Sequence, residues 1–152
     1  MKSLARAQDN AELVARLGKL TPQSERRWGR MNVHQMVCHL ADACRMALGQ
    51  KPVSDDTSIV KRTAIKWLAL YAPLQWKPGI LTRPEIDQQV AGTCPADFGS
   101  DIAEVKTLLD AIAKKGMLDT WPNHPVFGKM SASQWFRWAY LHTDHHLRQF
   151  GV

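Results

Sequence analysis

Apolar residues recur at intervals of three and four along most of this 152-residue sequence, and no segment of useful length alternates apolar and polar residues. The first spacing places side chains on one face of an α-helix, whereas alternation would be needed for a half-buried strand. The clearest stripe lies within residues 32–49 and contains Val33, Met36, Val37, Leu40, Cys44, Ala47 and Leu48. We therefore predict an all-α fold without a sheet.

Capping residues mark the ends of two long helices. Asn32 is a favourable N-cap for the helix that follows it, and Gly49 is a favourable stop. Ser131 and Gln134 form an S-x-x-Q capping-box pattern before an apolar run that continues to about Phe150. We expect one helix between each pair of boundaries.

Two more long helices are predicted from apolar spacing alone. They cover residues 9–19 and residues 98–115, the latter closed by Gly116. Between the first helix and Asn32, Thr21-Pro22 predicts a short turn or helix that ends near Arg27.

The segment 50–97 is the least regular part of the sequence. Residues 58–71 have helical composition, and prolines and glycines then interrupt the chain up to the next helix. A connection of this length favours a four-helix bundle with a long crossover between its second and third main helices. We expect one domain over residues 1–152.

Within that crossover, Lys61–Trp76 mixes basic and aromatic residues. Packing in the core or at a dimer contact is the favoured interpretation, and a wall of a substrate pocket is the alternative. A membrane-surface helix would need a cleaner division of its faces.

The formal charge of +6 and the pI of 9.5 raise the question of nucleic acid or an anionic membrane as a partner. The basic residues are scattered, however, and no run exceeds two. We therefore expect no nucleic-acid or membrane partner. The start of the chain lacks the apolar run of a secretory signal, so a cytoplasmic location is expected.

Cysteine usage points away from cross-links. Cys38, Cys44 and Cys94 are odd in number and lack CxxC spacing, so neither a disulfide framework nor a cysteine zinc site is indicated. Buried reduced thiols are the expected state.

Histidines continue the apolar face of the last predicted helix. His142 and His146 are four residues apart, so both imidazoles lie on one side, about 6 Å apart along the axis. Histidines with this spacing chelate one metal ion in other helices. His145 is an alternative partner for His142, because residues three apart are also neighbours.

A third ligand is expected from the second long helix. His39 lies at the edge of its apolar stripe, and Asp42 is placed to accept a hydrogen bond from its second ring nitrogen. Asp144 is about 200° around the last helix from His142 and His146 and is expected to face water. The sequence therefore favours a metal site formed by His39, His142 and His146.

Two other histidines are weaker candidates for metal ligands. His34 and Cys38 are also four apart and form a rival pair. His124 lies in the loop before the last helix, between Trp121 and Phe127, where it could line the site. A proline-fixed turn anchored by aromatic residues is the favoured interpretation, so His124 is not in the predicted ligand set.

Three sequence blocks carry a family resemblance. They are Trp28-Gly29-Arg30-Met31-Asn32-Val33-His34-Gln35-Met36-Val37-Cys38-His39-Leu40-Ala41-Asp42, His124-Pro125-Val126-Phe127-Gly128, and His142-Thr143-Asp144-His145-His146-Leu147-Arg148-Gln149-Phe150-Gly151. Together they resemble the DinB-like superfamily of metal-dependent enzymes, and most closely a branch described only as a domain of unknown function. Many DinB-like proteins have His-Arg-Gly-Gln after the final ligand. Here the corresponding residues are His146-Leu147-Arg148-Gln149.

The resemblance implies a four-helix bundle with a long crossover, commonly a homodimer. It also implies a divalent metal, often nickel or zinc, bound by a histidine that falls on His39 and a pair that falls on His142 and His146. Relatives include transferases and isomerases that use low-molecular-weight thiols, alongside hydrolases. We therefore expect either a thiol-dependent transferase or hydrolase acting on a small molecule, or a non-catalytic metal- or ligand-binding bundle.

Overall fold

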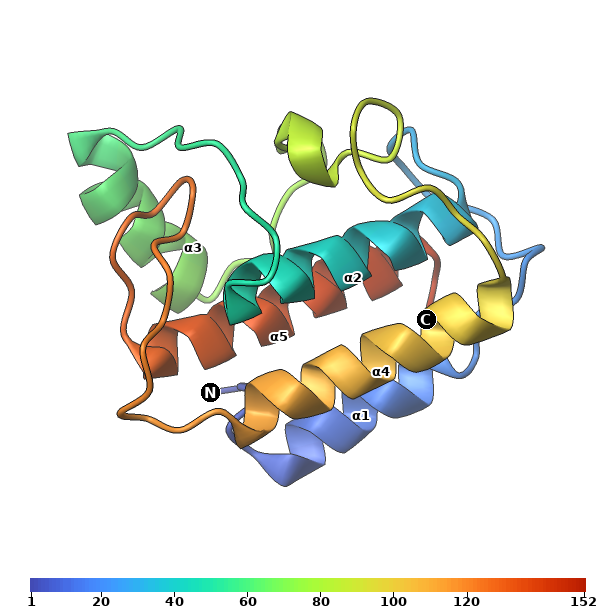
Figure 1. Ribbon diagram of the computed structural model, residues 1–152, viewed down its shortest axis with the longest axis horizontal. Helices are drawn as coiled ribbons and strands as arrows, with labels where there is room; N and C mark the ends of the chain where they lie inside the picture. Colours follow the sequence, from blue (N-terminus) through green and yellow to red (C-terminus); the bar gives the residue numbers. More distant parts are fainter.

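The computed structural model describes all 152 residues and contains helices and turns but no β-strand (Figure 1). The all-α prediction is thus confirmed. In chain order the elements are α1 (Ala7–Leu17), α2 (Val33–Leu48), the π-helical turn η1 (Lys61–Ile65), α3 (Lys66–Tyr71), the 3-10 turn η2 (Pro84–Ile86), α4 (Phe98–Lys114) and α5 (Ala132–Gln149).

The predicted caps set the register of α2 and α5. The Asn32 side chain accepts a hydrogen bond from the backbone N–H of Gln35, whose side chain accepts one from the N–H of Asn32. Ser131 and Gln134 form the same reciprocal pair at the start of α5. Each pair satisfies two backbone donors that a helix start leaves unpaired, and so fixes where the histidines lie along both helices.

The segment after Thr21-Pro22 forms a turn and no helix. The backbone N–H of Ser24 donates to the carbonyl oxygen of Thr21 at 2.9 Å, and no further helical turn follows. Residues 23–27 offer no apolar stripe to bury, so nothing offsets the cost of starting a helix.

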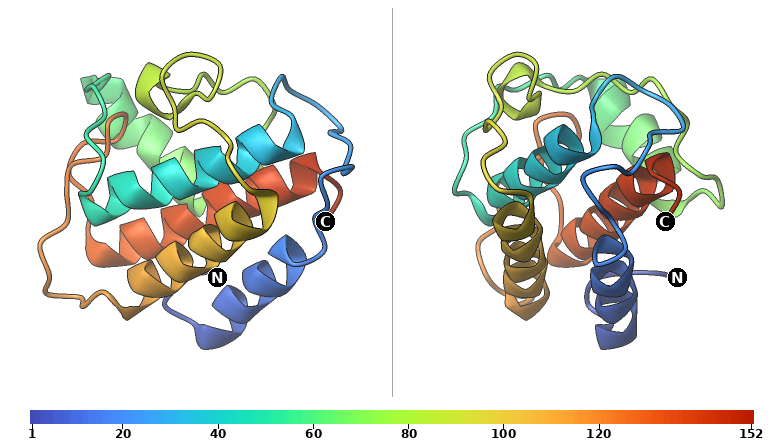
Figure 2. Two further views of the ribbon diagram at one scale, coloured as in Figure 1. Left: turned by 45° about the vertical axis from the view of Figure 1, so that its right-hand side comes forward. Right: turned by 90° about the vertical axis from the view of Figure 1, so that its right-hand side faces the viewer.

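The long helices run in two directions (Figures 1 and 2). α1 and α5 run one way, and α2 and α4 run the other way. α2 packs against α4 and α5, and α1 packs against the same two helices. Because α2 and α4 are parallel neighbours, the chain must return along the full length of α2 before α4 can begin. The long segment 49–97 makes this connection.

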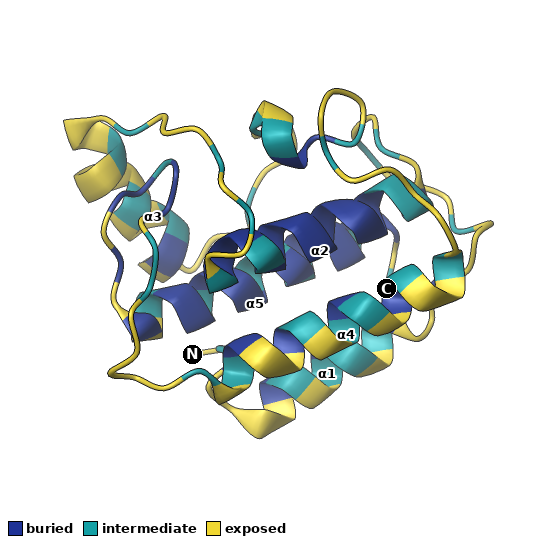
Figure 3. Cartoon of the chain, viewed as in Figure 1, coloured by how far each residue is buried: buried dark blue, intermediate teal, exposed yellow.

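Burial is concentrated in α2 and α5, whereas α1 and α4 keep exposed outer faces (Figure 3). Leu40 of α2 and Trp135 of α5 are completely buried. Side chains at the contact between α2 and α5 are therefore removed from water, which matters for the polar groups located there.

The prediction that Asp144 faces water is wrong. Its carboxylate lies 2.7 Å from Arg16 and 2.9 Å from Arg148, with 21% of the side chain exposed. The reason is that α1 packs against this side of α5 and brings Arg16 to it.

The core-packing interpretation of Lys61–Trp76 is wrong for most of α3. Leu70 is buried, but Trp67 is 62% exposed and Leu68 is 53% exposed. α3 packs on α5, where Arg137 donates from Nε to the carbonyl oxygen of Leu70 at 3.1 Å. No helix in the structure has both the length and the apolarity needed to cross a membrane.

Candidate metal centre

Three imidazoles meet between α2 and α5. His39 lies on α2, and His142 and His146 lie one turn apart on α5. Nε2 of His39 is 3.2 Å from Nε2 of His142, and the potential ligand atoms of all three residues lie within 4.8 Å of one another. Two nitrogens bound at ~2.05 Å to one tetrahedral ion would be about 3.3 Å apart. His39 and His142 already have the spacing for one ion, and His146 lies close enough to contribute a third ligand.

Hydrogen bonds on the outer side orient two of these rings. Nδ1 of His39 donates to the carbonyl oxygen of Ile86 at 2.6 Å, and Nδ1 of His146 donates to Oε1 of Gln149 at 2.8 Å. A carbonyl or amide oxygen can only accept, so the proton of each neutral ring is on Nδ1. The lone pair of each Nε2 is thereby free to bind a metal, and oxygen partners of this kind are typical around metal-bound histidines.

Asp42 does not hold His39, and this prediction is wrong. Its carboxylate accepts hydrogen bonds from Thr93 and Gln88 and forms ion pairs with Arg45 and Lys51. The crossover is the physical reason. It packs η2 against α2, so the Ile86 carbonyl reaches His39. Other crossover residues donate their hydrogen bonds to the Asp42 carboxylate, which is therefore not free to accept one from His39.

Burial keeps the three imidazoles neutral. It lowers the pKa of His39, and it lowers the pKa of His142 and His146 well below the ordinary histidine value. Mutual repulsion between the rings adds to the effect on His142 and His146. Neutral imidazole is the form that binds a metal ion, so the site needs little deprotonation at neutral pH.

His146, and not His145, lies beside His39 and His142. The His145 ring packs near Trp28 and Trp76, with centroids 5.9 Å and 6.1 Å away. Its Nδ1 is buried without a hydrogen-bond partner, and burial lowers its pKa. The i,i+4 spacing thus gives the convergent pair, as the sequence favoured.

A cavity of about 550 Å³ opens over the three histidines. Trp138 stacks on the His142 ring at an interplanar angle of 10° and forms part of the wall. Much of the remaining lining comes from α3, the chain after it and the loop before α5. These residues include Ile65, Leu68, Leu74, Trp76, Ile80, Leu81, Pro125, Val126 and Phe127. The crossover segment therefore supplies a pocket wall, which was the alternative interpretation of Lys61–Trp76.

His124 both anchors its loop and lines this cavity. Its Nδ1 accepts hydrogen bonds from the backbone N–H groups of Val126 and Phe127, each at 3.1 Å, and its ring stacks on Phe127. Burial lowers its pKa to about 3. The aromatic turn predicted from the sequence is present, and His124 is not in the convergent group.

The rival pair His34 and Cys38 lies apart from the three histidines and contacts Asp101 of α4. Cys38 and Cys44 are buried, and burial raises the pKa of both thiols to about 12. Cys94 is exposed, so the prediction of buried thiols is wrong for this residue. It lies in the irregular chain before α4, where no packed helix covers it.

The fold and the site define an all-α protein with a buried three-histidine group that could hold a metal ion. The model of the family described as "Protein of unknown function (DUF1569)" matches residues 2–151, and the chain belongs to this family. The match agrees with the predicted branch of unknown function. Searches of the curated proteins and of the solved structures gave no match.

Proposed function

We propose that this protein is a metal-dependent enzyme that binds nickel or zinc through His39, His142 and His146. We further propose that it is a thiol-dependent transferase or a hydrolase that acts on a small molecule. The convergence of three neutral imidazoles, two of them with Nδ1 already engaged, carries the proposal. Three protein ligands leave positions open for water or substrate, as in catalytic rather than structural zinc sites.

A divalent ion at this site would supply a Lewis acid that lowers the pKa of a bound water or thiol. The chain's own residues would bind the ion and orient its imidazole ligands. Ile86 and Gln149 hold two of the imidazoles, and Trp138 restricts the rotation of His142. The apolar side chains of the cavity wall would contact the uncharged part of a bound molecule.

The charge of the cavity favours an anionic substrate. The three histidines are neutral, the only charged residues in the lining are Lys77 and Arg83, and no Asp or Glu contributes. A divalent ion would therefore add positive charge that no lining side chain balances. A thiol that binds as thiolate, or a substrate with a carboxylate or phosphate, would compensate this charge.

A non-catalytic metal- or ligand-binding protein is the second candidate. It is favoured by the same lining, which contains no carboxylate, cysteine, serine or tyrosine. The two imidazoles of the lining outside the convergent group, His124 and His145, have pKa values lowered by burial, which makes them weak bases. Under this reading the cavity binds an anionic ligand on the metal and releases it unchanged.

The arrangement of the helices supports the finer fold assignment. α1, α4, α2 and α5 contact one another in a closed ring, and a long crossover joins the parallel pair α2 and α4. We infer a DinB-like four-helix bundle from this arrangement, and we retain the expectation of a cytoplasmic homodimer.

Elemental analysis of tag-free protein tests the metal site. We expect a His142→Ala/His146→Ala variant, whose fold is checked by circular dichroism, to bind about one divalent ion per chain fewer than the parent protein. His145→Ala is the matched control, because His145 lies on the same helix outside the convergent group, and it should retain the ion. Equal metal content in all three proteins after soaking with zinc or nickel would overturn the proposal.

Turnover assays with the loaded protein then separate the two candidates. Transfer from a low-molecular-weight thiol, or ester hydrolysis, that disappears in the double variant would support the enzyme. Full metal occupancy without turnover on any thiol or ester would favour the binding protein.

A further inference from the structure

A second group of metal-binding side chains lies where α2 meets α4. His34 and Cys38 are one turn apart on α2, and Asp101 is in the first turn of α4. Their potential ligand atoms all lie within 4.8 Å of one another. None of the three lines the cavity over His39, His142 and His146. Since Cys38 and His39 are successive residues, their side chains leave α2 about 100° apart.

The distances suit a divalent ion with mixed donors. Sγ of Cys38 is 3.6 Å from Oδ2 of Asp101. A sulfur at about 2.3 Å and an oxygen at about 2.1 Å from one tetrahedral ion would also be about 3.6 Å apart. Nε2 of His34 is 2.6 Å from the same oxygen, so this pair would have to open by about 0.8 Å. Both side chains are near the surface, with 24% and 17% exposure, and have room to do so.

The surroundings hold the donors in place. The His34 ring packs edge-on against Phe98, with centroids 5.3 Å apart, and Asp101 accepts a hydrogen bond from the backbone N–H of Ala96. The carboxylates of Asp42 and Glu104 add to the negative potential that Asp101 imposes at Cys38. A cation is therefore favoured at this position over an anion.

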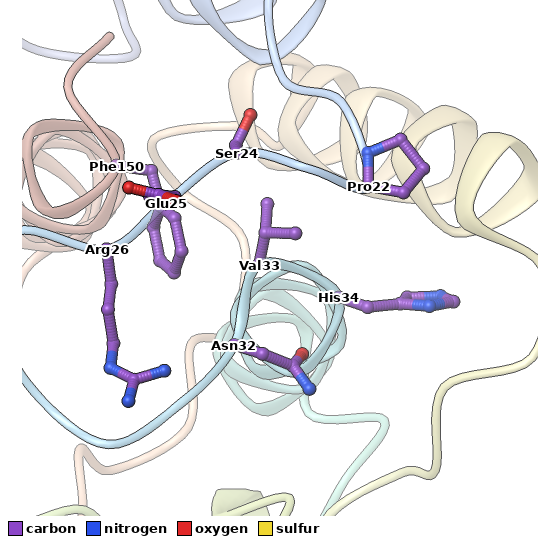
Figure 4. A pocket seen from close by; sticks show the side chains of 8 residues that line it. All are labelled: Pro22, Ser24, Glu25, Arg26, Asn32, Val33, His34 and Phe150. Carbon is purple, nitrogen blue, oxygen red and sulfur yellow. The ribbon is translucent and has the colours of Figure 1, made fainter.

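Solvent can reach this group from one side. His34 lines a polar cavity of about 520 Å³ between the chain at residues 22–26 and the start of α2. Figure 4 shows His34 pointing to the opposite side of α2 from Arg26 and Phe150. Water could supply the fourth ligand, and an ion could enter and leave without unfolding of the chain.

We propose that His34, Cys38 and Asp101 form a second divalent-cation site, which joins the first two turns of α2 to the first turn of α4. The donor set of one nitrogen, one sulfur and one oxygen selects zinc or cobalt over magnesium or calcium, which prefer oxygen. On binding, the S–H bond of Cys38 breaks, its electron pair bonds to the ion, and the proton leaves to solvent. Nε2 of His34 carries the proton that it donates to Asp101 in this structure. On binding, this proton leaves to solvent and Nδ1 takes one up from solvent, so the ring stays neutral and the Nε2 lone pair bonds to the ion.

Cobalt(II) titration followed by absorbance tests the site. A cobalt–thiolate bond gives a charge-transfer band in the near ultraviolet, and the three-histidine site has no sulfur and gives none. We expect this band in the tag-free protein, saturating at about one cobalt per chain beyond the first site, and also in the His142→Ala/His146→Ala variant. If that variant does not fold, the cobalt titration of the wild-type protein alone still tests the site.

Three single variants assign the band. Cys38→Ser should abolish it, and Asp101→Asn should weaken cobalt binding by more than about tenfold, since loss of even an outer partner costs that much. Cys44→Ser is the matched control, a buried thiol outside the group, and should retain the band. The absence of any band in the wild-type protein, or its persistence in Cys38→Ser through the exposed Cys94, would overturn the proposal.

Discussion

Gln149 accepts a hydrogen bond from His146: its Oε1 lies 2.8 Å from Nδ1 of the imidazole. The other end of the same amide donates to the carbonyl oxygen of Trp28 at 2.8 Å, which fixes the direction in which the amide points. A side chain one turn along α5 thus sets the tautomer of a proposed ligand, and the chain before α2 holds that side chain in turn.

Replacing this amide should weaken metal binding without removing a ligand. For Gln149→Leu we expect a 10- to 100-fold lower zinc affinity, about the loss found for other outer partners of ligand histidines. Gln149→Glu keeps an acceptor for Nδ1 but loses the donor to the Trp28 carbonyl, so it should lose less affinity than Gln149→Leu without reaching the wild-type level. Competition with a chromophoric chelator measures both. Equal affinity in the leucine variant would show that Gln149 does not orient the ligand.

Acid should destabilise the fold below pH 6.5 because of His124. Burial lowers its pKa from 6.5 to about 3, so between these values the unfolded chain binds a proton that the folded chain does not. The stability that the neutral ring contributes is fully present above pH 6.5 and falls by about 1.4 kcal/mol per pH unit on acidification, until the folded ring also protonates. The other buried histidines, with pKa values also lowered, steepen the slope.

Urea unfolding at several pH values checks this prediction in the metal-free protein. His124→Gln provides the comparison, because an amide oxygen can accept the hydrogen bonds from Val126 and Phe127 but does not titrate. Between pH 3 and pH 6.5 this variant should take up about one proton fewer on unfolding than the wild type, so its free energy of unfolding should change less with pH. An unchanged dependence would contradict the assignment.

Lys77 should contribute to anion binding in the cavity. It lines the wall, and no acidic side chain pairs with it. Lys77→Gln should raise the KM for an anionic thiol about two- to fivefold and leave kcat unchanged, the effect of losing one partly solvated charge. The loss should shrink at high salt. Lys19→Gln, an exposed lysine at the end of α1, should have no effect. A larger effect on kcat than on KM would contradict a binding role.

The expectation of a homodimer stays a prediction, and α3 is where we expect the contact. Its apolar side chains Trp67, Leu68 and Tyr71 are exposed, and the exposed Leu74 follows three residues later in the chain. Exposed apolar surface of this kind marks contact sites in many proteins. Light scattering should give the mass of two chains, and Trp67→Glu should give one. Val90→Glu, an exposed apolar residue elsewhere, is the control. A monomer at all concentrations would contradict the prediction.

Much of the helical framework and the histidine group could be predicted from local signals. The capping residues Asn32 and Ser131 identify helix starts, and the spacing of His142 and His146 places them on one side of α5. These features depend on residues within a few positions of one another, which is where sequence patterns are informative.

The partner of His39 could not be predicted in this way. Ile86 is 47 positions away and contributes a backbone carbonyl, a group that every residue carries and no sequence pattern marks. Asp42 is closer in sequence and has a carboxylate that could accept from His39, but this carboxylate accepts hydrogen bonds from Thr93 of the same crossover instead. The cavity could not be predicted for the same reason, since much of its wall is irregular chain without periodic spacing.

This division between helices and crossover bears on how such a protein could change over evolutionary time. The proposed ligands lie on two well-buried helices, where most substitutions disturb packing, whereas the wall residues Leu74, Ile80 and Leu81 lie in exposed, irregular chain that tolerates replacement. The range of accepted molecules could therefore drift while the ion site stays intact. Libraries confined to residues 74–83 would be the economical route to a new specificity.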